Sequence, residues 1–367
     1  DLPAAAASIV NEEFAAAGAV GVASAGPGRL AAVTILEHGD DDQKSRYLRR
    51  ILTGEDPWCQ LFSEPGSGSD LAGATTRADL GISANEPVWI VNGQKVWNTS
   101  AHHASYGLLV ARTDWDVPKH QGLSYFIIDM RQTGVEVQQL RQMNGYASFN
   151  EVFFTDARID PEDLLESPGR GWQIAMTTLA HERRMGDVMR STSSVTDREG
   201  SIYAEVAAEN AIALEPYRWY PQRAGRVDLL VERARETGRI RDPLVRQEIA
   251  RVLMLAKSAQ WTAMRARAAQ VQGKPQGPEG SLGKLAASNI ARAAADAHAL
   301  ISGAEAVLSG HDGPMDGLIA EILLSVPAVS IAGGTDEIQR NIIAERVLGL
   351  DKEPRFDTGP FRDVRRN

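Results

Sequence analysis

The chain has 367 residues, 43% hydrophobic and 24% charged, which predicts a globular protein with a large core and two or three domains. A net charge of -9 argues against a general nucleic-acid binder, which needs a basic surface. No apolar run is long enough for a membrane span, and the start has no signal-peptide pattern. Cys59 is the only cysteine, so no intrachain disulfide can form, and a reducing, cytoplasmic location is expected.

Residues 1–57 are predicted to form an incomplete N-terminal helical domain. Alanine is abundant there, and charged residues stand among apolar ones at helical spacing. Gly39 followed by Asp40, Asp41 and Asp42 indicates a turn and an N-cap before a helix over Gln43–Thr53.

Residues 58–160 predict a central antiparallel β-barrel-like domain, because short β-branched and aromatic runs are separated by Gly and Asp. Asn92-Gly93 between Val88–Val91 and Gln94–Trp97 predicts a tight hairpin, since this dipeptide accepts positive φ. Further strands are expected at Tyr106–Arg112, Leu123–Met130, Val135–Leu140 and Val152–Thr155.

Residues 161–350 predict a C-terminal four-helix bundle, and residues 351–367 a tail. Residues 187–226 are polar, aromatic and irregular and fit no regular element. The whole chain is therefore expected to be an α+β multidomain protein. The four helical patterns are Trp172–Arg184, Arg246–Gln272, Ser281–Ala306 and Asp336–Leu348.

The segment Ser63–Asp70 reads Ser-Glu-Pro-Gly-Ser-Gly-Ser-Asp and predicts a tight, exposed loop at a strand end. Backbone N–H groups and serine hydroxyls of such a loop can face a ligand, although a plain surface turn has the same composition. Cys59, just before it, is interpreted as a small buried hydrophobe, because no His follows it in a nucleophile pattern.

Gly333-Gly334 predicts a tight turn, after which Thr335 can cap a helix that begins with Asp336 and Glu337. Such a junction can bind an oxyanion or a phosphate, although an ordinary helix start has the same pattern. An apolar stripe along this helix is expected from Ile338, Ile342, Val347 and Leu348.

Together, the segments 58–70, Trp97-Asn98-Thr99 and 331–340 resemble the acyl-CoA dehydrogenase family. The resemblance implies the order helical domain, β domain, helical bundle, with FAD as cofactor and a homotetramer or dimer as the assembly. It implies α,β-dehydrogenation of an acyl-CoA thioester, with an electron-transfer flavoprotein as acceptor.

The resemblance also assigns site residues. Trp97 would cover one flavin face, the Thr99 hydroxyl would approach flavin N5, and Ser69 would contact the acyl-CoA. Asn98 stands where the family usually has an apolar residue, and Ser63 where Thr is commoner. The implied cofactor contacts are Gln60, Leu61, Phe62, Ser63, Trp97, Asn98, Thr99, Thr335 and Glu337.

Many family members carry their catalytic Glu immediately before Gly-Thr, where this chain has Gly333. A subgroup that includes isovaleryl- and long-chain-type enzymes takes its base from the helix after the β domain. Glu182 matches that base, and Arg183 matches the substrate-binding Arg that follows it. The backbone N–H of Gly333 would donate to the thioester oxygen. His181 lies roughly 100° from Glu182 around the helix and is interpreted as structural; no metal site is expected.

Two departures from the family leave alternatives open. No Arg-x-x-Phe-Gly segment is present, although Arg239 or Arg241 stands nearby, and Leu300–Ala304 replaces a Gln-x-x-Gly-Gly stretch. A heteromeric assembly, in which a related chain supplies the missing contacts, is one alternative. An acyl-CoA oxidase or related flavin monooxygenase is another. A fatty-acyl or nucleotide-binding module without redox chemistry is the third.

Overall fold

The computed structural model describes residues 27–83, 85–189, 200–205, 208, 217–273, 277, 279–354 and 357–364. The chain divides into two compact units. Residues 22–185 and 353–367 form one, called here the β unit. Residues 1–21 and 186–352 form the other, called here the helical unit.

Two helices precede the sheet in the β unit, α2 (Pro27–His38) and α3 (Asp41–Thr53). The turn and the N-cap predicted before α3 are confirmed. The Asp40 carboxylate accepts from the backbone N–H of Gln43 at 2.8 Å, and the Gln43 side chain accepts from the N–H of Asp40 at 3.0 Å. This reciprocal capping box satisfies two backbone donors that the helix itself leaves unpaired. Helices expected before residue 27 lie outside the described residues.

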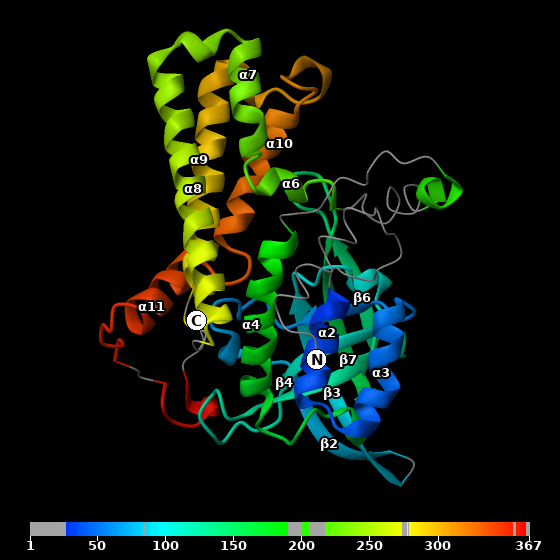
Figure 1. Ribbon diagram of the computed structural model, residues 1–367. Coiled ribbons are helices and arrows are strands. Elements are labelled where there is room, and N and C mark those ends of the chain that lie inside the picture. Colours follow the sequence, from blue (N-terminus) through cyan, green and yellow to red (C-terminus); the bar gives the residue numbers. More distant parts are fainter. Residues whose placement is uncertain are drawn as a thin grey trace. The chain divides into compact units, whose positions relative to one another are not determined.

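A seven-stranded sheet forms the centre of the β unit (Figure 1). Its order is β1-β4-β2-β3-β7-β6, with β5 paired to β4. Most neighbours are antiparallel as expected, whereas β1 and β2 both lie parallel to β4. The strands are β1 (Trp58–Leu61), β2 (Arg77–Ser83), β3 (Glu86–Val96), β4 (Tyr106–Arg112), β5 (Leu123–Asp129), β6 (Val135–Leu140) and β7 (Phe149–Ile159).

The hairpin predicted at Asn92-Gly93 is wrong, because β3 runs through both residues. The ladder with β7 shifts register between Val91 and Gly93, which marks a bulge, and Gly93 has φ +149°. A Cβ on Gly93 would lie 2.7 Å from Cα of Thr76, so only glycine allows this approach. The hairpin instead joins β2 to β3. The sequence pattern missed β2, and it predicted only the middle of β7.

Helix α4 (Gly171–Met189) follows the sheet, and its first part is anchored to the β unit. Thr178 of α4 is fully buried, and its hydroxyl lies 2.9 Å from that of Thr34 and 3.0 Å from that of Tyr125. Ile174 and Ala175 belong to the same core cluster as residues of α2, α3, β4 and β5. The first part of α4 is therefore held by contacts to the sheet and to α2.

In the helical unit, the two longest helices pack along each other, and shorter helices contact α9 (Figure 1). The expected helix over 281–306 ends earlier, at Ser302, and a 3₁₀ turn follows. In the irregular 187–226 region, the described part includes Trp219, which is buried. The helices are α6 (Tyr220–Arg223), α7 (Leu230–Glu236), α8 (Pro243–Val271), α9 (Glu279–Ser302), α10 (Leu318–Ser325) and α11 (Asp336–Arg346).

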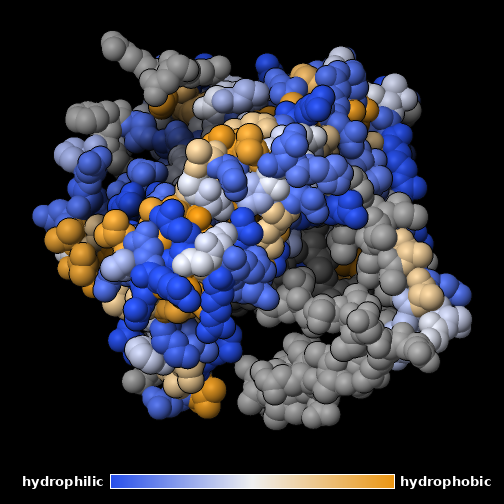
Figure 2. Space-filling view, turned by 90° about the horizontal axis from the view of Figure 1, so that it is seen from above, coloured by the Kyte–Doolittle hydropathy of each residue, from blue (hydrophilic) through white to orange (hydrophobic). Residues whose placement is uncertain are grey.

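The described surface carries scattered apolar residues. On the face seen in Figure 2, hydrophobic residues form separate small patches among hydrophilic ones. Within the described ranges, no helix has the length and apolar character that crossing a membrane would require.

Candidate active site

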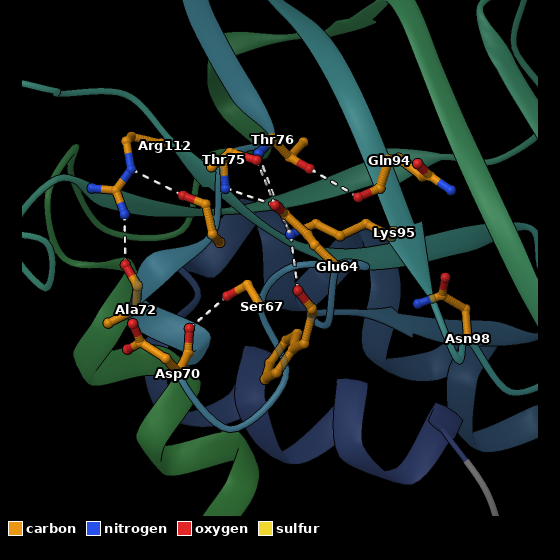
Figure 3. A network of polar contacts seen from close by, with 12 residues as sticks. Glu64, Ser67, Asp70, Ala72, Thr75, Thr76, Gln94, Lys95, Asn98 and Arg112 are labelled. Atoms are coloured by element: carbon orange, nitrogen blue, oxygen red, sulfur yellow. Dashed lines mark hydrogen bonds and ion pairs between the residues drawn. The ribbon is translucent and has the colours of Figure 1, made fainter. Parts of the chain in front are cut away.

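The loop after β1 is built around a buried ion pair (Figure 3). Lys95 Nζ lies 2.8 Å from Glu64 Oε1 and also donates to the Phe62 carbonyl at 2.9 Å. The backbone N–H groups of Thr75 and Thr76 donate to the two oxygens of Glu64 at 2.7 and 2.9 Å. Burial by itself raises the pKa of Glu64, but the Lys95 ammonium and these hydrogen bonds outweigh it and lower the pKa to about 2. Glu64 is therefore a charged structural anchor for the loop.

The tip of the loop is a tight turn, in which Glu64 and Ser67 exchange two backbone hydrogen bonds of 3.0 Å. Ser69, predicted to contact the acyl-CoA, is exposed. The next residue, Asp70, accepts from Lys119 Nζ at 2.9 Å, and Lys119 also pairs with Asp357 of the C-terminal segment. Residues 351–367, expected to be a plain tail, thus include a segment that holds the base of this loop.

The residues Leu61 and Phe62 differ from Ser63 in what they can offer a ligand. Leu61 and Phe62 are buried in the core of the β unit, where their side chains pack against other core residues. Ser63 is half-buried, and its carbonyl accepts from the N–H of Val96 at 2.9 Å. Cys59 is fully buried, and burial raises the pKa of its thiol, which confirms the interpretation as a core residue.

The Trp97-Asn98-Thr99 segment leaves β3 through a left-handed residue, Trp97, at φ +64°. The Trp97 side chain is 59% exposed and meets Phe149 edge to face, with 6.0 Å between the ring centroids. Asn98 is buried and donates from Nδ2 to the Gln60 carbonyl at 2.8 Å. Thr99 is half-buried. The fold therefore places this segment beside β1.

Glu182 lies on α4 and is half-buried. Its carboxylate Oε2 lies 3.4 Å from Nε2 of Gln60, a residue 122 positions earlier in the chain. His181 points elsewhere, because its Nε2 lies 2.6 Å from Oε1 of Glu37 on α2. The fold thus brings the predicted base to the strand that carries the predicted cofactor contacts, and it separates His181 from both. The Arg183 side chain lies outside the described part.

The Gly-Gly motif belongs to the helical unit. Thr335 caps α11 as predicted, since its hydroxyl accepts from the N–H of Ile338 at 3.3 Å. Gly333 and Gly334 both have positive φ, and a Cβ on Gly334 would lie 2.6 Å from Nε2 of Gln339. Gln339 in turn donates to the carbonyls of Gly333 and Gly334, each at 3.2 Å. This side chain, which the sequence pattern did not suggest, fixes the turn.

Asp336 and Glu337 occupy the first turn of α11 but have different surroundings. Asp336 is buried and bonded to Ser288 at 2.8 Å, Lys284 at 3.1 Å and Arg292 at 3.2 Å. Burial acts to raise the pKa of Asp336, but these hydrogen bonds and charges lower it below its usual range. Glu337 is exposed and pairs with Arg340 at 3.2 Å. Asp336 therefore anchors α11 to α9, and Glu337 is left accessible.

Other sequence predictions have mixed outcomes. The apolar stripe on α11 is only partly covered, because Ile338 and Ile342 are half-buried whereas Val347 and Leu348 are exposed. Arg239 pairs with Asp242 of the same turn at 3.1 Å. Within the described residues, no group of three or more His, Cys, Asp or Glu side chains is arranged to hold a metal ion.

Three family models match the chain. They describe the N-terminal domain (residues 1–55), the middle domain (59–157) and the C-terminal domain (223–348) of acyl-CoA dehydrogenases. Acyl-CoA dehydrogenase IpdE1 of Mycolicibacterium smegmatis is 34% identical over 352 residues, which cover 93% of this chain and 80% of that protein. This chain belongs to the acyl-CoA dehydrogenase family.

Solved structures show the same acyl-CoA dehydrogenase fold. The ChsE4-ChsE5 complex from Mycobacterium tuberculosis matches with a TM-score of 0.69 and 24% identity, covering 94% of this chain and 82% of that one. The glutaryl-coenzyme A dehydrogenase glutaryl-CoA complex matches with a TM-score of 0.67 and 23% identity, covering 90% and 75%. The expected order of N-terminal helical, middle β and C-terminal helical domains is thus confirmed, and the protein is an acyl-CoA dehydrogenase, an oxidoreductase of lipid metabolism.

Proposed function

We propose that this acyl-CoA dehydrogenase removes an α-proton from an acyl-CoA thioester with Glu182, in an FAD-dependent α,β-dehydrogenation. The supporting observation is the 3.4 Å approach of the Glu182 carboxylate to Gln60. Gln60 stands in the segment predicted to line the flavin, and Glu182 stands on a helix anchored separately to the sheet. A carboxylate held beside a cofactor segment is the arrangement that base-assisted dehydrogenation needs.

The residues around this carboxylate fit a flavin. The Trp97 indole is 59% exposed and presents a large aromatic face against which a planar ring can stack. Ser63 and Thr99 are half-buried residues, and their hydroxyls can donate to or accept from a polar ring edge. The chemistry that a bound FAD would supply is acceptance of the hydride from the β carbon. Thr335 and Glu337 of the helical unit are proposed as further FAD contacts.

The protein's own residues then have three tasks. Glu182 accepts the α-proton, which is only weakly acidic, so the proton acceptor must be close and correctly oriented. The backbone N–H of Gly333 donates to the thioester oxygen as negative charge develops there. Ser69 and Arg183 bind the acyl-CoA. A backbone donor works with any side chain, so Gly333 serves this task although it carries no acid.

The test is the substitution Glu182→Gln, which keeps the shape and removes the base. Turnover of butyryl-, octanoyl- and isovaleryl-CoA, followed with ferrocenium as electron acceptor, should fall by about 10²–10⁴-fold for whichever substrate the native protein uses. The visible flavin spectrum should be unchanged. His181→Gln is the matched control and should keep most of the turnover. Unchanged turnover in Glu182→Gln would reject the assignment.

The proposed electron acceptor is an electron-transfer flavoprotein. The alternative is oxygen, which would make the protein an acyl-CoA oxidase or a related monooxygenase. Oxygen consumption and peroxide formation, measured during turnover without ferrocenium, separate the two. Peroxide produced at the full rate of turnover would reject the electron-transfer flavoprotein.

The proposed assembly is a homotetramer or dimer, with a heteromer as the second candidate. Two observations favour the heteromer. Arg239 pairs within its own turn, and the chain resembles one of the structures described as a complex of two named chains, ChsE4 and ChsE5. Purification of the chain alone decides: one flavin per chain supports a homo-oligomer, whereas a colourless protein that gains flavin only on co-expression with a related chain supports a heteromer.

A further inference from the structure

Asn98 carries a buried side-chain amide, and only 2% of the residue is exposed. Burying an amide is costly unless it is hydrogen-bonded. Its Nδ2 donates to the Gln60 carbonyl at 2.8 Å, whereas within the described residues its Oδ1 accepts no hydrogen bond. The side-chain oxygen of Asn98 is thus unsatisfied, whereas its side-chain nitrogen is bonded. The side chain of Asn98 therefore acts through its hydrogen bond to Gln60.

A second buried amide holds Asn98. The backbones of Asn98 and Asn150 exchange hydrogen bonds of 3.0 and 3.1 Å, and Asn150 Nδ2 donates to the Asn98 carbonyl at 2.7 Å. Asn150 Oδ1 lies 3.0 Å from Nδ1 of His102. Asn150 is fully buried. Asn98 and Asn150 form a pair, called here the amide clamp, that is rigid because several short bonds share one buried site.

The amide clamp holds the backbone of Gln60, whose side chain reaches toward α4. Nε2 of Gln60 lies 3.4 Å from Oε2 of Glu182. An amide nitrogen only donates, so it favours the ionised form of a carboxylate over the protonated one. The α4 helix is anchored independently, through the Thr178 and Tyr125 hydroxyls at 3.0 Å. Glu182 is therefore approached by a donor from β1 while its own backbone is held through β5.

Other described titratable groups stand on the elements packed against α4. Tyr125 is fully buried, and burial together with the Glu182 charge raises the pKa of its hydroxyl. Glu37 of α2 is paired with His181 at 2.6 Å. His38 of α2 is paired with Glu166 at 2.6 Å. Gln60 is a neutral donor that reaches Glu182 from β1.

We propose that Gln60 is the positioning residue for Glu182 and that Asn98 holds Gln60 in register for this task. The proposal rests on the proposed function, in which Glu182 is the base. The Gln60 amide bonds one carboxylate oxygen, Oε2, which orients the group and favours its ionised form.

The test is Gln60→Leu, which removes the donor at similar volume. Without it the ionised carboxylate is less stable, so the acid limb of the kcat–pH profile should move to higher pH by about 0.5–1 unit. At low pH kcat should fall about three- to tenfold. Gln60→Glu places a like charge beside Glu182 and should move the limb further in the same direction. Asn98→Leu should move it less, because Gln60 then keeps its side chain but loses its anchor.

The matched control is Gln138→Leu. Gln138 on β6 also donates to a carboxylate, Glu136 at 2.7 Å, but this contact is exposed. The substitution should leave the pH profile unchanged. An unmoved acid limb in both Gln60→Leu and Gln60→Glu, with turnover abolished in Glu182→Gln, would overturn the positioning role alone. Retained turnover in Glu182→Gln would overturn the proposed function instead.

A measurement without turnover gives a second readout. The infrared difference between the protein and its Glu182→Gln variant isolates one carboxyl, whose protonation can be followed with pH. The midpoint pH of this protonation should rise when the protein and its Glu182→Gln variant both also carry Gln60→Leu. An unchanged midpoint would contradict the proposal even for a variant that fails to bind flavin.

Discussion

Lys95 and Glu64 are joined by a 2.8 Å ion pair in the interior of the β unit, where the Lys95 side chain is fully buried. Glu64 belongs to the loop that carries Ser63 and Ser69, whereas Lys95 belongs to β3, which leads into Trp97. The pair therefore ties the two segments predicted to line the flavin.

Breaking this pair should be strongly destabilising. Glu64→Gln leaves the Lys95 ammonium buried without a counter-charge, at a cost of about 3–5 kcal/mol in the free energy of unfolding. Replacing both residues, as in Glu64→Leu with Lys95→Met, should cost far less, because no buried charge remains. Urea unfolding of Glu64→Gln and of the double variant measures both values. Equal losses in the single and double variants would contradict this account.

The same pair predicts an acid limb of stability. The pKa of Glu64 is lowered from 4.5 to about 2, so its contribution is present above pH 4.5 and is lost as the pH falls through about 2. The linked free energy is about 3 kcal/mol over that range. Urea titrations between pH 6 and about 2 should therefore show that the free energy of unfolding of the native protein decreases as the pH is lowered. The slope should be smaller in the double variant Glu64→Leu with Lys95→Met.

Asp336 and Glu337 should separate stability from cofactor binding. Asp336→Ala leaves Lys284 and Arg292 facing each other without their shared carboxylate and should cost about 3 kcal/mol. Glu337→Ala removes an exposed pair with Arg340, so its effect on unfolding should stay below about 0.5 kcal/mol. As a proposed FAD contact, Glu337→Ala should instead weaken flavin binding, measured by equilibrium titration of the apoprotein. A large loss of stability in Glu337→Ala, together with weaker flavin binding but native stability in Asp336→Ala, would refute these two roles.

Phe361 should show that the C-terminal segment is part of the β unit. Its buried ring lies under the Arg112 guanidinium, 3.5 Å from Cζ to the ring centroid, and its N–H donates to the Val117 carbonyl at 2.9 Å. Phe361→Ala should cost about 3–5 kcal/mol in thermal or urea unfolding, as for other buried aromatics. Arg362→Ala, one residue on and exposed, is the control and should cost little. A neutral Phe361→Ala would show that the segment is dispensable.

Local sequence signals predicted several elements well. Tyr106–Arg112 and Val135–Leu140 are strands with the expected bounds, and the caps of α3 and α11 stand at Asp40 and Thr335. These features depend on residues a few positions apart. The hairpin at Asn92-Gly93 was wrong because positive φ serves a bulge as well as a turn, and only the pairing of β3 with β7 decides which occurs.

The sequence by itself determined the family, through three short motifs, and it singled out Glu182 through the missing acid at Gly333. The tertiary structure alone decided what holds these residues. Lys95 lies against Glu64, Asn98 against Gln60, and Gln60 against Glu182, across separations of 31, 38 and 122 residues. Such contacts arise from strand pairing and helix docking, which bring distant side chains together in a way that no local periodicity records.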